Sequence, residues 1–227
     1  MKHARISRKE LAKMIDSTNV KATATRTEIE TLCKEAVQYH FGCVCVNSVY
    51  VKFAAPLLKD SKVRLSSTVG FPLGTSLSEI KALEAVKAIE DGADELDMVI
   101  NLSALKSGDC DAVKQDIEAV VDVKRLSNEI VVKVIIETAH LTNDEKMIAC
   151  KLAKEAGADF VKTSTGFFGR GATVEDVRLM RRTVGKNMGV KAAGGIRTYA
   201  DAMAMIEAGA NRIGTSSAVA IVREASP

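Results

Sequence analysis

The 227-residue sequence contains no tryptophan and only three prolines, and aromatic residues make up 4% of it. A chain so poor in aromatic rings offers no stacking platform of the kind that proteins binding single-stranded nucleic acid use. Its charges nearly cancel, because 32 lysines and arginines stand against 29 acidic residues and leave a net charge of +3. That charge is too small to indicate nucleic acid or a membrane surface as the main partner.

Long apolar runs and paired cysteine motifs are also missing. No run approaches the roughly 18–20 apolar residues that a membrane-spanning helix needs. No apolar segment follows the charged residues Met1–Arg5, as one would in a secretory signal. The five cysteines include no C-x-x-C pair, so neither a disulfide framework nor a zinc site is indicated. We therefore expect a cytoplasmic protein without a metal, in which Cys43 and Cys45 are buried small residues on one face of a strand.

What the sequence does contain is a regular alternation of short apolar runs and longer segments of helical period. Most of these runs are continuously apolar, as in parallel strands that are covered on both faces. No break in composition divides the chain. We therefore predict an α/β fold, a single (β/α)8 TIM barrel over residues 1–227, with a doubly wound open sheet as the alternative. The predicted strands are Lys13–Asp16, Cys43–Asn47, Arg64–Gly70, Glu95–Ile100, Val131–Glu137, Phe160–Ser164, Gly189–Gly194 and Arg212–Thr215.

Helix-start signals and a short repeat support this alternation. Capping-box spacing occurs at Ser76–Glu79 and Thr142–Glu145, with weaker forms at Thr173–Asp176 and Thr198–Asp201. Gly92, Gly157 and Gly209 each stand in a repeated motif that ends a predicted helix and leads into a strand. Five positions after each glycine the strands hold a carboxylate, an amine and a glycine at equivalent depth: Asp97, Lys162 and Gly214.

Charged residues inside the apolar predicted strands are the candidates for chemistry, because burying them is costly. Lys162 and Lys191 lie in neighbouring strands about 4.8 Å apart. If both point into the barrel mouth, each amine lowers the pKa of the other, and a free amine is what a Schiff-base nucleophile requires. The alternative for Lys162 is a lysine that reaches solvent or pairs with a carboxylate. Lys133, near the start of its strand, is interpreted as structural, an ion-pair partner.

Two acidic residues and two glycine-rich turns complete the candidate site. Asp97 could move protons or balance a lysine, and Asp16, which ends the first predicted strand, could orient substrate hydroxyls or a lysine, or cap a loop. Ala193–Thr198 and Ile213–Ser217 follow strands seven and eight, the usual phosphate position in such barrels. The turn that begins at Thr163 could contribute. Together these features indicate a Schiff-base enzyme that acts on a phosphorylated aldehyde or ketone.

From about Asp16 to Ser217 the sequence resembles the deoxyribose-phosphate aldolase family. The segments that carry the resemblance, in order, are Ser67–Gly74, Glu95–Asn101, Lys133–Thr138, Asp159–Phe167, Val190–Thr198 and Arg212–Ser217. The resemblance implies a class I aldolase. Such an enzyme would reversibly cleave 2-deoxy-D-ribose 5-phosphate to D-glyceraldehyde 3-phosphate and acetaldehyde, as part of deoxyribose phosphate catabolism, without a cofactor or a metal.

The resemblance also implies roles for individual residues. Lys162 would be the Schiff-base lysine, Lys191 the second lysine that keeps it unprotonated, and Asp97 a partner of Lys191 in proton transfer. Asp16 and Thr18 match positions near the substrate hydroxyls. The phosphate site is matched by glycines and serines with an arginine beside them: Gly166, Gly194, Gly195, Gly214, Ser216, Ser217 and Arg197.

Some expectations stay open at this stage. Some relatives have a basic residue where Phe167 stands, so phosphate binding here would depend more on backbone N–H groups than on charge. Cys45 ends its predicted strand near the mouth and could react with aldehydes. The alternatives to the aldolase are a phosphosugar isomerase or decarboxylase on the same barrel, and a non-catalytic phosphosugar-binding protein. We expect a homo-oligomer, a dimer or tetramer, in which Ala200–Ala210 packs on the barrel or forms a subunit contact.

Overall fold

Eight parallel strands close into a barrel in which each strand pairs with the next in the sequence and the last pairs with the first. The strands are β1 (Ile15–Asn19), β2 (Cys43–Val46), β3 (Arg64–Val69), β4 (Glu95–Val99), β5 (Val131–Ile135), β6 (Phe160–Lys162), β7 (Gly189–Ala193) and β8 (Arg212–Thr215). This structure, a computed structural model, describes residues 6–225. The segment 1–5, on which the expectation about a secretory signal rests, lies outside the described residues. The predicted TIM barrel is confirmed, and the open sheet is wrong.

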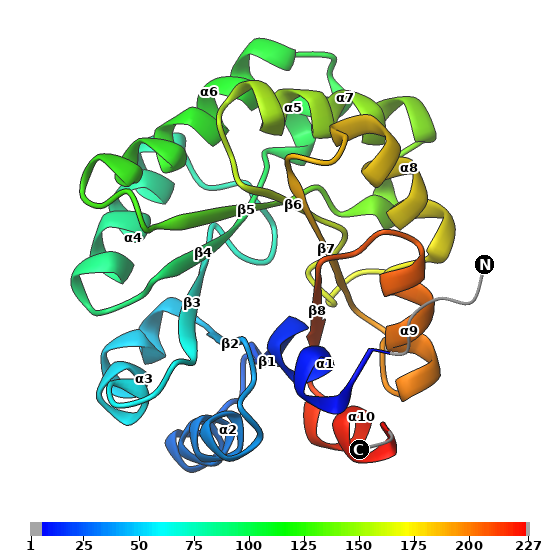
Figure 1. Cartoon of the computed structure of the whole chain (residues 1–227). Coiled ribbons are helices and arrows are strands. Elements are labelled where there is room, and N and C mark those ends of the chain that lie inside the picture. Colours follow the sequence, from blue (N-terminus) through cyan, green and yellow to red (C-terminus); the bar gives the residue numbers. More distant parts are fainter. Residues whose placement is uncertain (1–5, 226–227) are drawn as a thin grey trace.

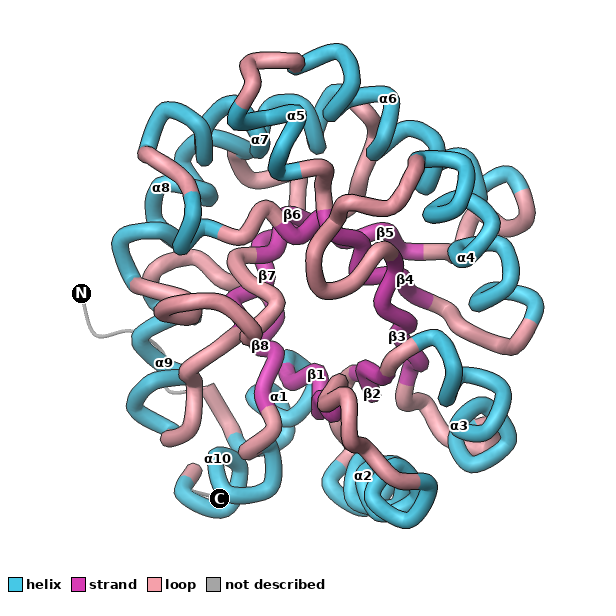
Figure 2. The backbone as a smooth tube through the Cα atoms, turned by 180° about the vertical axis from the view of Figure 1, so that it is seen from behind, coloured by secondary structure: helices cyan, strands magenta, loops and turns pink. Residues whose placement is uncertain are grey.

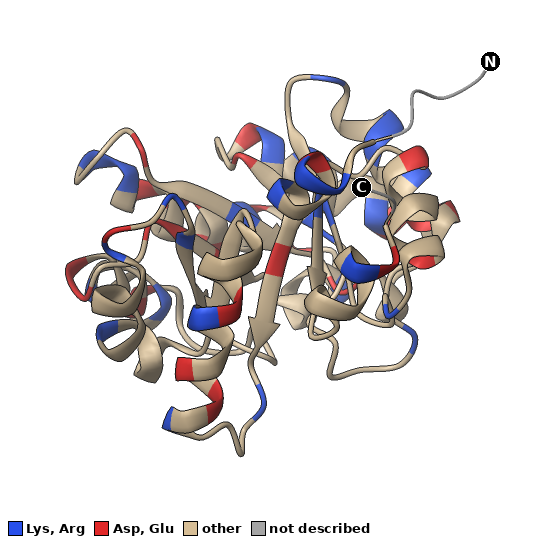
Figure 3. Cartoon of the chain, turned by 60° about the horizontal axis from the view of Figure 1, so that its bottom comes forward, with Lys and Arg blue, Asp and Glu red and all other residues tan. Residues whose placement is uncertain are grey.

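Helices surround the ring of strands and supply the crossovers that parallel neighbours need (Figure 1, Figure 2). They are α1 (Arg8–Met14), α2 (Arg26–Tyr39), α3 (Val51–Leu58), α4 (Ser78–Glu90), α5 (Leu102–Lys106), α6 (Cys110–Val121), α7 (Asn143–Glu155), α8 (Val174–Val184), α9 (Tyr199–Glu207) and α10 (Ala218–Glu224). Among the described residues, no helix has the length and hydropathy needed to cross a membrane. Both basic and acidic residues occur on the surrounding helices in the view of Figure 3.

The strands begin where the sequence predicts, except for the first. Seven strands start at the predicted residue and end at it or up to two residues before it, but Lys13 and Met14 belong to α1 rather than to β1. Helix α1 begins at Arg8 because Ser7 and Glu10 form a capping box, in which each side chain accepts a hydrogen bond from the backbone N–H of the other residue. Leu11 and Ala12 on α1 are buried, as is Ile15 at the start of β1. The hydrophobic pattern therefore runs from the helix into the strand without a break.

Three of the four predicted helix starts are confirmed. The hydroxyls of Thr142, Thr173 and Thr198 each accept a hydrogen bond from the third helical N–H. The fourth, at Ser76, is wrong, because α4 begins at Ser78 and its cap residue makes no side-chain bond. The Ser78 hydroxyl instead donates to a carboxylate oxygen of α6, 3.0 Å away. Tertiary contact with α6 therefore takes the place of a local cap.

The strands divide their side chains between an apolar outer layer and a polar interior. On β4, Leu96 and Met98 belong to the hydrophobic core that packs under the helices. Glu95 and Asp97, which alternate with them, are fully buried and form ion pairs with side chains of other strands. The barrel interior thus holds charge that the helices and the core keep away from water.

Candidate active site

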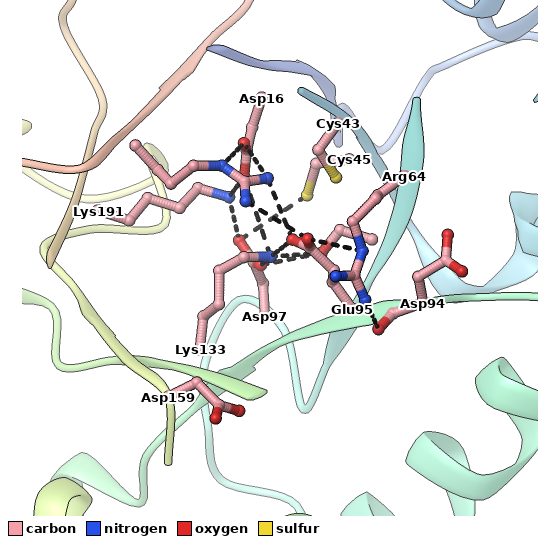
Figure 4. A network of polar contacts seen from close by, with 12 residues as sticks. Asp16, Cys43, Cys45, Arg64, Asp94, Glu95, Asp97, Lys133, Asp159 and Lys191 are labelled. Carbon is pink, nitrogen blue, oxygen red and sulfur yellow. Dashed lines mark hydrogen bonds and ion pairs between the residues drawn. The ribbon is translucent and has the colours of Figure 1, made fainter. Parts of the chain in front are cut away.

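The barrel interior holds a cluster of ionisable side chains from six strands, all of them buried except the partly buried Arg212. Its members are three carboxylates and four cations: Asp16 on β1, Glu95 and Asp97 on β4, Lys133 on β5, Lys162 on β6, Lys191 on β7 and Arg212 on β8. Figure 4 shows the side chains of Asp16, Glu95, Asp97, Lys133 and Lys191 converging on one another. We call these seven residues the charge cluster.

Asp97 lies at the centre of the charge cluster and contacts three lysines. One carboxylate oxygen accepts hydrogen bonds from Lys133 Nζ at 2.7 Å and from the Ser66 hydroxyl at 2.9 Å. The other accepts from Lys162 Nζ at 2.6 Å and from Lys191 Nζ at 2.7 Å. Burial alone would raise the pKa of Asp97, but the three ammonium groups outweigh it and hold this pKa well below its usual value. Asp97 is therefore an ionised carboxylate that links two lysines of adjacent strands.

Lys162 and Lys191 are direct neighbours in the register between β6 and β7, as predicted. Lys191 Nζ lies 2.5 Å from an oxygen of Asp16 as well as 2.7 Å from Asp97. Burial favours a lower pKa for Lys191, but these two carboxylates outweigh it and raise the pKa. The expectation that the two amines depress each other is thus wrong for Lys191, because carboxylates from β1 and β4 enclose it. These two contacts favour the ammonium form of Lys191.

Lys133 lies deeper in the barrel and links the remaining acids of the charge cluster. Its Nζ is 2.6 Å from Glu95 and 2.7 Å from Asp97, so the interpretation as an ion-pair partner is confirmed. Arg212, whose importance the sequence reading missed, contacts Asp16 at 2.6 Å and Glu95 at 3.1 Å. The one signal for Arg212 in the sequence is its charge at the first position of a predicted strand. Its partner Asp16 stands 196 residues away in the chain.

Lys162 is the member of the charge cluster that also lines a cavity at the carboxyl ends of the strands. The cavity has a volume of about 380 Å³ and takes its walls from β1, the loops after β6 and β7, and β8. Lys162 is 4% exposed, whereas Lys133 and Lys191 are completely buried. A small molecule in the cavity can therefore reach the Lys162 amine, and the other two lysines act on it from behind.

The predicted phosphate turns line the same cavity. The wall residues that the sequence predicts are Thr18, Gly166, Gly194, Gly195, Arg197, Gly214 and Ser216. Gly194 and Gly195 both have positive φ, and a side chain on Gly194 would approach the backbone of Gly171 to 3.0 Å. Among the described residues, the N–H groups of Gly194, Gly195 and Ser216 have no hydrogen-bond acceptor. They are free to bind an anion.

Three predicted substrate residues do not line the cavity. The Thr163 hydroxyl is bonded to the backbone of Ala193 at 3.1 Å, because it faces the neighbouring strand. Ser217 lies behind Thr215, whose hydroxyl accepts from its N–H at 2.9 Å. Asp16 is the second residue of β1 rather than its end, and its carboxylate is turned to Lys191 and Arg212. Of the alternatives for Asp16, the orientation of a lysine is the one that its ion pair with Lys191 favours.

The two cysteines of β2 point into the barrel, as their spacing predicts, and both are fully buried. Cys45 Sγ lies 3.9 Å from Asp97. Burial, followed by the charge of Asp97, raises the pKa of its thiol, so the expected reaction of Cys45 with aldehydes is disfavoured. Cys43 offers a ligand atom near those of Asp16 and Glu95. Those two carboxylates are engaged by Arg212, so this set does not resemble a free metal site.

The comparisons with known proteins agree with this geometry. Residues 10–224 match the model of the DeoC/LacD family aldolases. The chain is 63% identical over 95% of its length, and 96% of the relative's, to a protein of Thermococcus gammatolerans named deoxyribose-phosphate aldolase. It is 60% identical, over 97% and 99% of the two lengths, to the protein of that name from Thermococcus kodakarensis.

A solved structure of an aldolase is also similar to this chain. The deoxyribose phosphate aldolase from Aeropyrum pernix, described as a tetramer, superposes with a TM-score of 0.90 at 38% identity. The match covers 96% of this chain and 91% of that one.

Proposed function

The chain belongs to the DeoC/LacD family of aldolases, and we propose that it is a class I aldolase acting on 2-deoxy-D-ribose 5-phosphate. The products are D-glyceraldehyde 3-phosphate and acetaldehyde, and the reaction is reversible. The observation that carries the proposal is the position of Lys162, which touches Asp97 at 2.6 Å and lines the cavity. The names and coverage of the relatives support the substrate.

The charge cluster prepares Lys162 to act as the nucleophile. With every lysine protonated, four cations face three carboxylates: Lys133, Lys162, Lys191 and Arg212 against Asp16, Glu95 and Asp97. Arg64 also pairs with Glu95, but its side chain is 37% exposed and solvated. Lys162 is the cation that has one carboxylate and a path to solvent. Attack on an aldehyde requires the free amine of this lysine.

The steps of the proposed reaction follow from a free amine on Lys162. Lys162 Nζ attacks C1 of the open-chain sugar, and loss of water gives an iminium ion. As the C3 hydroxyl loses its proton, the C2–C3 bond breaks and its electrons move into the iminium, which becomes an enamine. D-Glyceraldehyde 3-phosphate leaves. The enamine takes up a proton at C2, and water then releases acetaldehyde and the free lysine.

Asp97 and Lys191 are the groups placed to handle these protons. Lys191 Nζ and Lys162 Nζ bind the same oxygen of Asp97, so a proton can pass between the two amines through that carboxylate. Lys191 stays close to the reacting nitrogen as a cation, because Asp16 and Asp97 raise its pKa. We assign Lys162 as the nucleophile, Asp97 and Lys191 as the proton-transfer pair, and Asp16 as the residue that orients Lys191.

The phosphate of the substrate lies against the wall formed by the turns after β6, β7 and β8. The free N–H groups of Gly194, Gly195 and Ser216 bind its oxygens, and Arg197, which also lines the cavity, adds positive charge. Phe167 lines the same cavity and carries no charge. We propose that backbone donors supply more of the phosphate affinity than a basic side chain at position 167 would.

We also propose that the protein is a homo-oligomer that works in the cytoplasm. The tetrameric description of the Aeropyrum pernix relative supports an assembly. The Ala/Met-rich helix α9 buries Ala202 and Met205 against its own barrel, which favours packing within the subunit for that stretch. All five cysteines are free, and four are buried, in keeping with a reducing compartment.

The assignment of Lys162 is tested by replacing it and a matched lysine. We expect Lys162→Met to lose ~10⁴-fold or more in kcat, measured as release of glyceraldehyde 3-phosphate in a coupled assay, because the nucleophile is gone. Lys146→Met is the control, since Lys146 is also buried and ion-paired, with Asp176 at 2.6 Å, but lies outside the cavity. Turnover retained by Lys162→Met would overturn the proposed mechanism.

A further inference from the structure

Glu137 stands in an unusual backbone conformation just beyond the end of β5. Its φ of 51° and ψ of 68° lie in the left-handed region, which L-residues other than glycine rarely adopt. Among the described residues, only His40 shares a positive φ without being glycine. Glu137 is also fully buried. A conformation of this kind persists only where the surroundings hold it, and it often marks a functional constraint.

The side chain of Glu137 holds the segment that follows the proposed nucleophile. One carboxylate oxygen accepts hydrogen bonds from the N–H of Thr165, at 2.9 Å, and from its hydroxyl. That hydroxyl in turn accepts from the N–H of Phe167 at 3.1 Å. The residue before Glu137, Ile136, donates its N–H to the carbonyl of Lys162 at 3.0 Å. Glu137 thus fixes the turn after β6 through a chain of two hydrogen bonds.

This turn forms part of the cavity wall. Thr165, Gly166 and Phe167 all line the cavity. Gly166 Cα lies 3.6 Å from the place of a Cβ on Gly194, so the turn abuts the predicted phosphate turn after β7. The ring of Phe167 packs edge-on against Phe71, with 5.3 Å between the ring centroids. A shift of the turn after β6 would therefore move the wall that faces the substrate phosphate.

The stability of the fold alone gives a poor reason for a carboxylate at position 137. Its second oxygen is buried and has no hydrogen-bond partner among the described residues, and no cation there pairs with it. Asp116, another buried carboxylate, uses both oxygens, on Lys81, the Ser78 hydroxyl and the Asn101 N–H. A half-satisfied buried carboxylate is costly, so its presence points to the contact that it does make.

We propose that Glu137 is a positioning residue, which holds Thr165 so that the turn after β6 presents its phosphate-facing wall next to Gly194. The inference deepens the proposed function and rests on it for the identity of the substrate. Because the wall faces the phosphate and not the aldehyde, displacement of the turn acts on the binding of phosphorylated substrate more than on the bond changes at Lys162.

The test compares two substrates that differ only in the phosphate. For the full-length protein and its variants, kcat and KM are measured with 2-deoxyribose 5-phosphate and with 2-deoxyribose. We expect Glu137→Ala to lower the ratio of the two kcat/KM values roughly 10-fold or more, mainly through a higher KM for the phosphorylated sugar. Thr165→Val removes the same hydroxyl link and lowers the ratio in the same direction, and Thr165→Ser, which keeps the hydroxyl, recovers most of it.

Asp116→Asn is the matched control for structural damage, because it disturbs a buried carboxylate that touches no cavity residue. It lowers the melting temperature without moving the substrate ratio. If Glu137→Ala lowers the melting temperature while its ratio stays at the parent value, Glu137 is merely structural and the proposal is wrong. If Glu137→Ala does not fold, the contrast between Thr165→Val and Thr165→Ser decides, and equal ratios in those two variants overturn the proposal.

A binding measurement separates this proposal from the proposed function. If the parent protein does not cleave 2-deoxyribose 5-phosphate, the proposed function fails, and inorganic phosphate serves as the probe. A rise in melting temperature with phosphate that Asp116→Asn keeps and Glu137→Ala loses supports the positioning role. Equal rises in all three proteins, or none in the parent, contradict it.

Discussion

A methyl group added at Gly214 should disable the site through Lys191. A Cβ at this position would lie 3.0 Å from the Cβ of Ala193 and 3.1 Å from Cε of Lys191, whereas carbon atoms pack best at about 3.5–4.0 Å. Lys191 cannot retreat without cost, because its amine is held by Asp16 at 2.5 Å and Asp97 at 2.7 Å. Overpacking of this degree costs roughly 1–3 kcal/mol, and displacement of Lys191 from Asp97 would lower kcat roughly 10–100-fold.

The assay combines calorimetric unfolding with steady-state kinetics on Gly214→Ala and on a control from the neighbouring strand. Gly189 lies two residues before Lys191 on β7, but the atoms nearest its new methyl in Gly189→Ala are those of the Phe160 ring, at 2.2 Å. This variant should therefore lower the melting temperature without a matching loss of kcat per folded molecule. Parental kcat in Gly214→Ala, or an equal loss of kcat in Gly189→Ala, would refute the argument that the glycine makes room for Lys191.

Two further predictions concern the charge cluster. Burial would raise the pKa of Asp16, but Lys191 and Arg212 outweigh it and lower this pKa from 3.8 to about 2. A carboxylate whose pKa is lower in the folded protein stabilises the fold at pH values above its pKa in the unfolded chain. About 2 kcal/mol of this stabilisation should therefore be lost as the pH falls from 4 to 2. Urea unfolding should show a flatter acid limb for Asp16→Asn, and equal limbs would contradict the assignment. Lys133→Met removes the partner of Glu95 and Asp97 and should destabilise the fold by roughly 3–5 kcal/mol; a loss below about 1 kcal/mol in urea unfolding would contradict its role.

The sequence predicts the fold well because the strands read as continuous apolar runs with glycine turns before them. It fails at the start of β1, where the apolar residues of α1 run into the strand and only the Ser7–Glu10 pair marks the helix. It fails at α4 because Ser78 bonds Asp116, 38 residues away. Both errors arise where a contact or a boundary leaves no local pattern.

The candidate site is predicted in its members but not in its electrostatics. Equal offsets from three glycines bring out Asp97 and Lys162, and adjacent strands bring out Lys191. The sequence does not show that Asp16, at the other end of the chain, reaches Lys191 and reverses the expected shift of its pKa. The sequence predicts Gly214 as part of the phosphate site. The structure shows in addition that the missing side chain at Gly214 leaves room for the side chain of Lys191. Long-range pairing decides both points.

The central claim is that Lys162 forms the covalent intermediate, and reductive trapping tests it most directly. The protein is incubated with 2-deoxyribose 5-phosphate or with acetaldehyde, borohydride is added, and the adduct is located by intact mass and peptide mapping. We predict one reduced adduct, on the peptide that contains Lys162, and none in Lys162→Met. An adduct on Lys191, or no adduct from a protein that cleaves the sugar phosphate, would contradict the account.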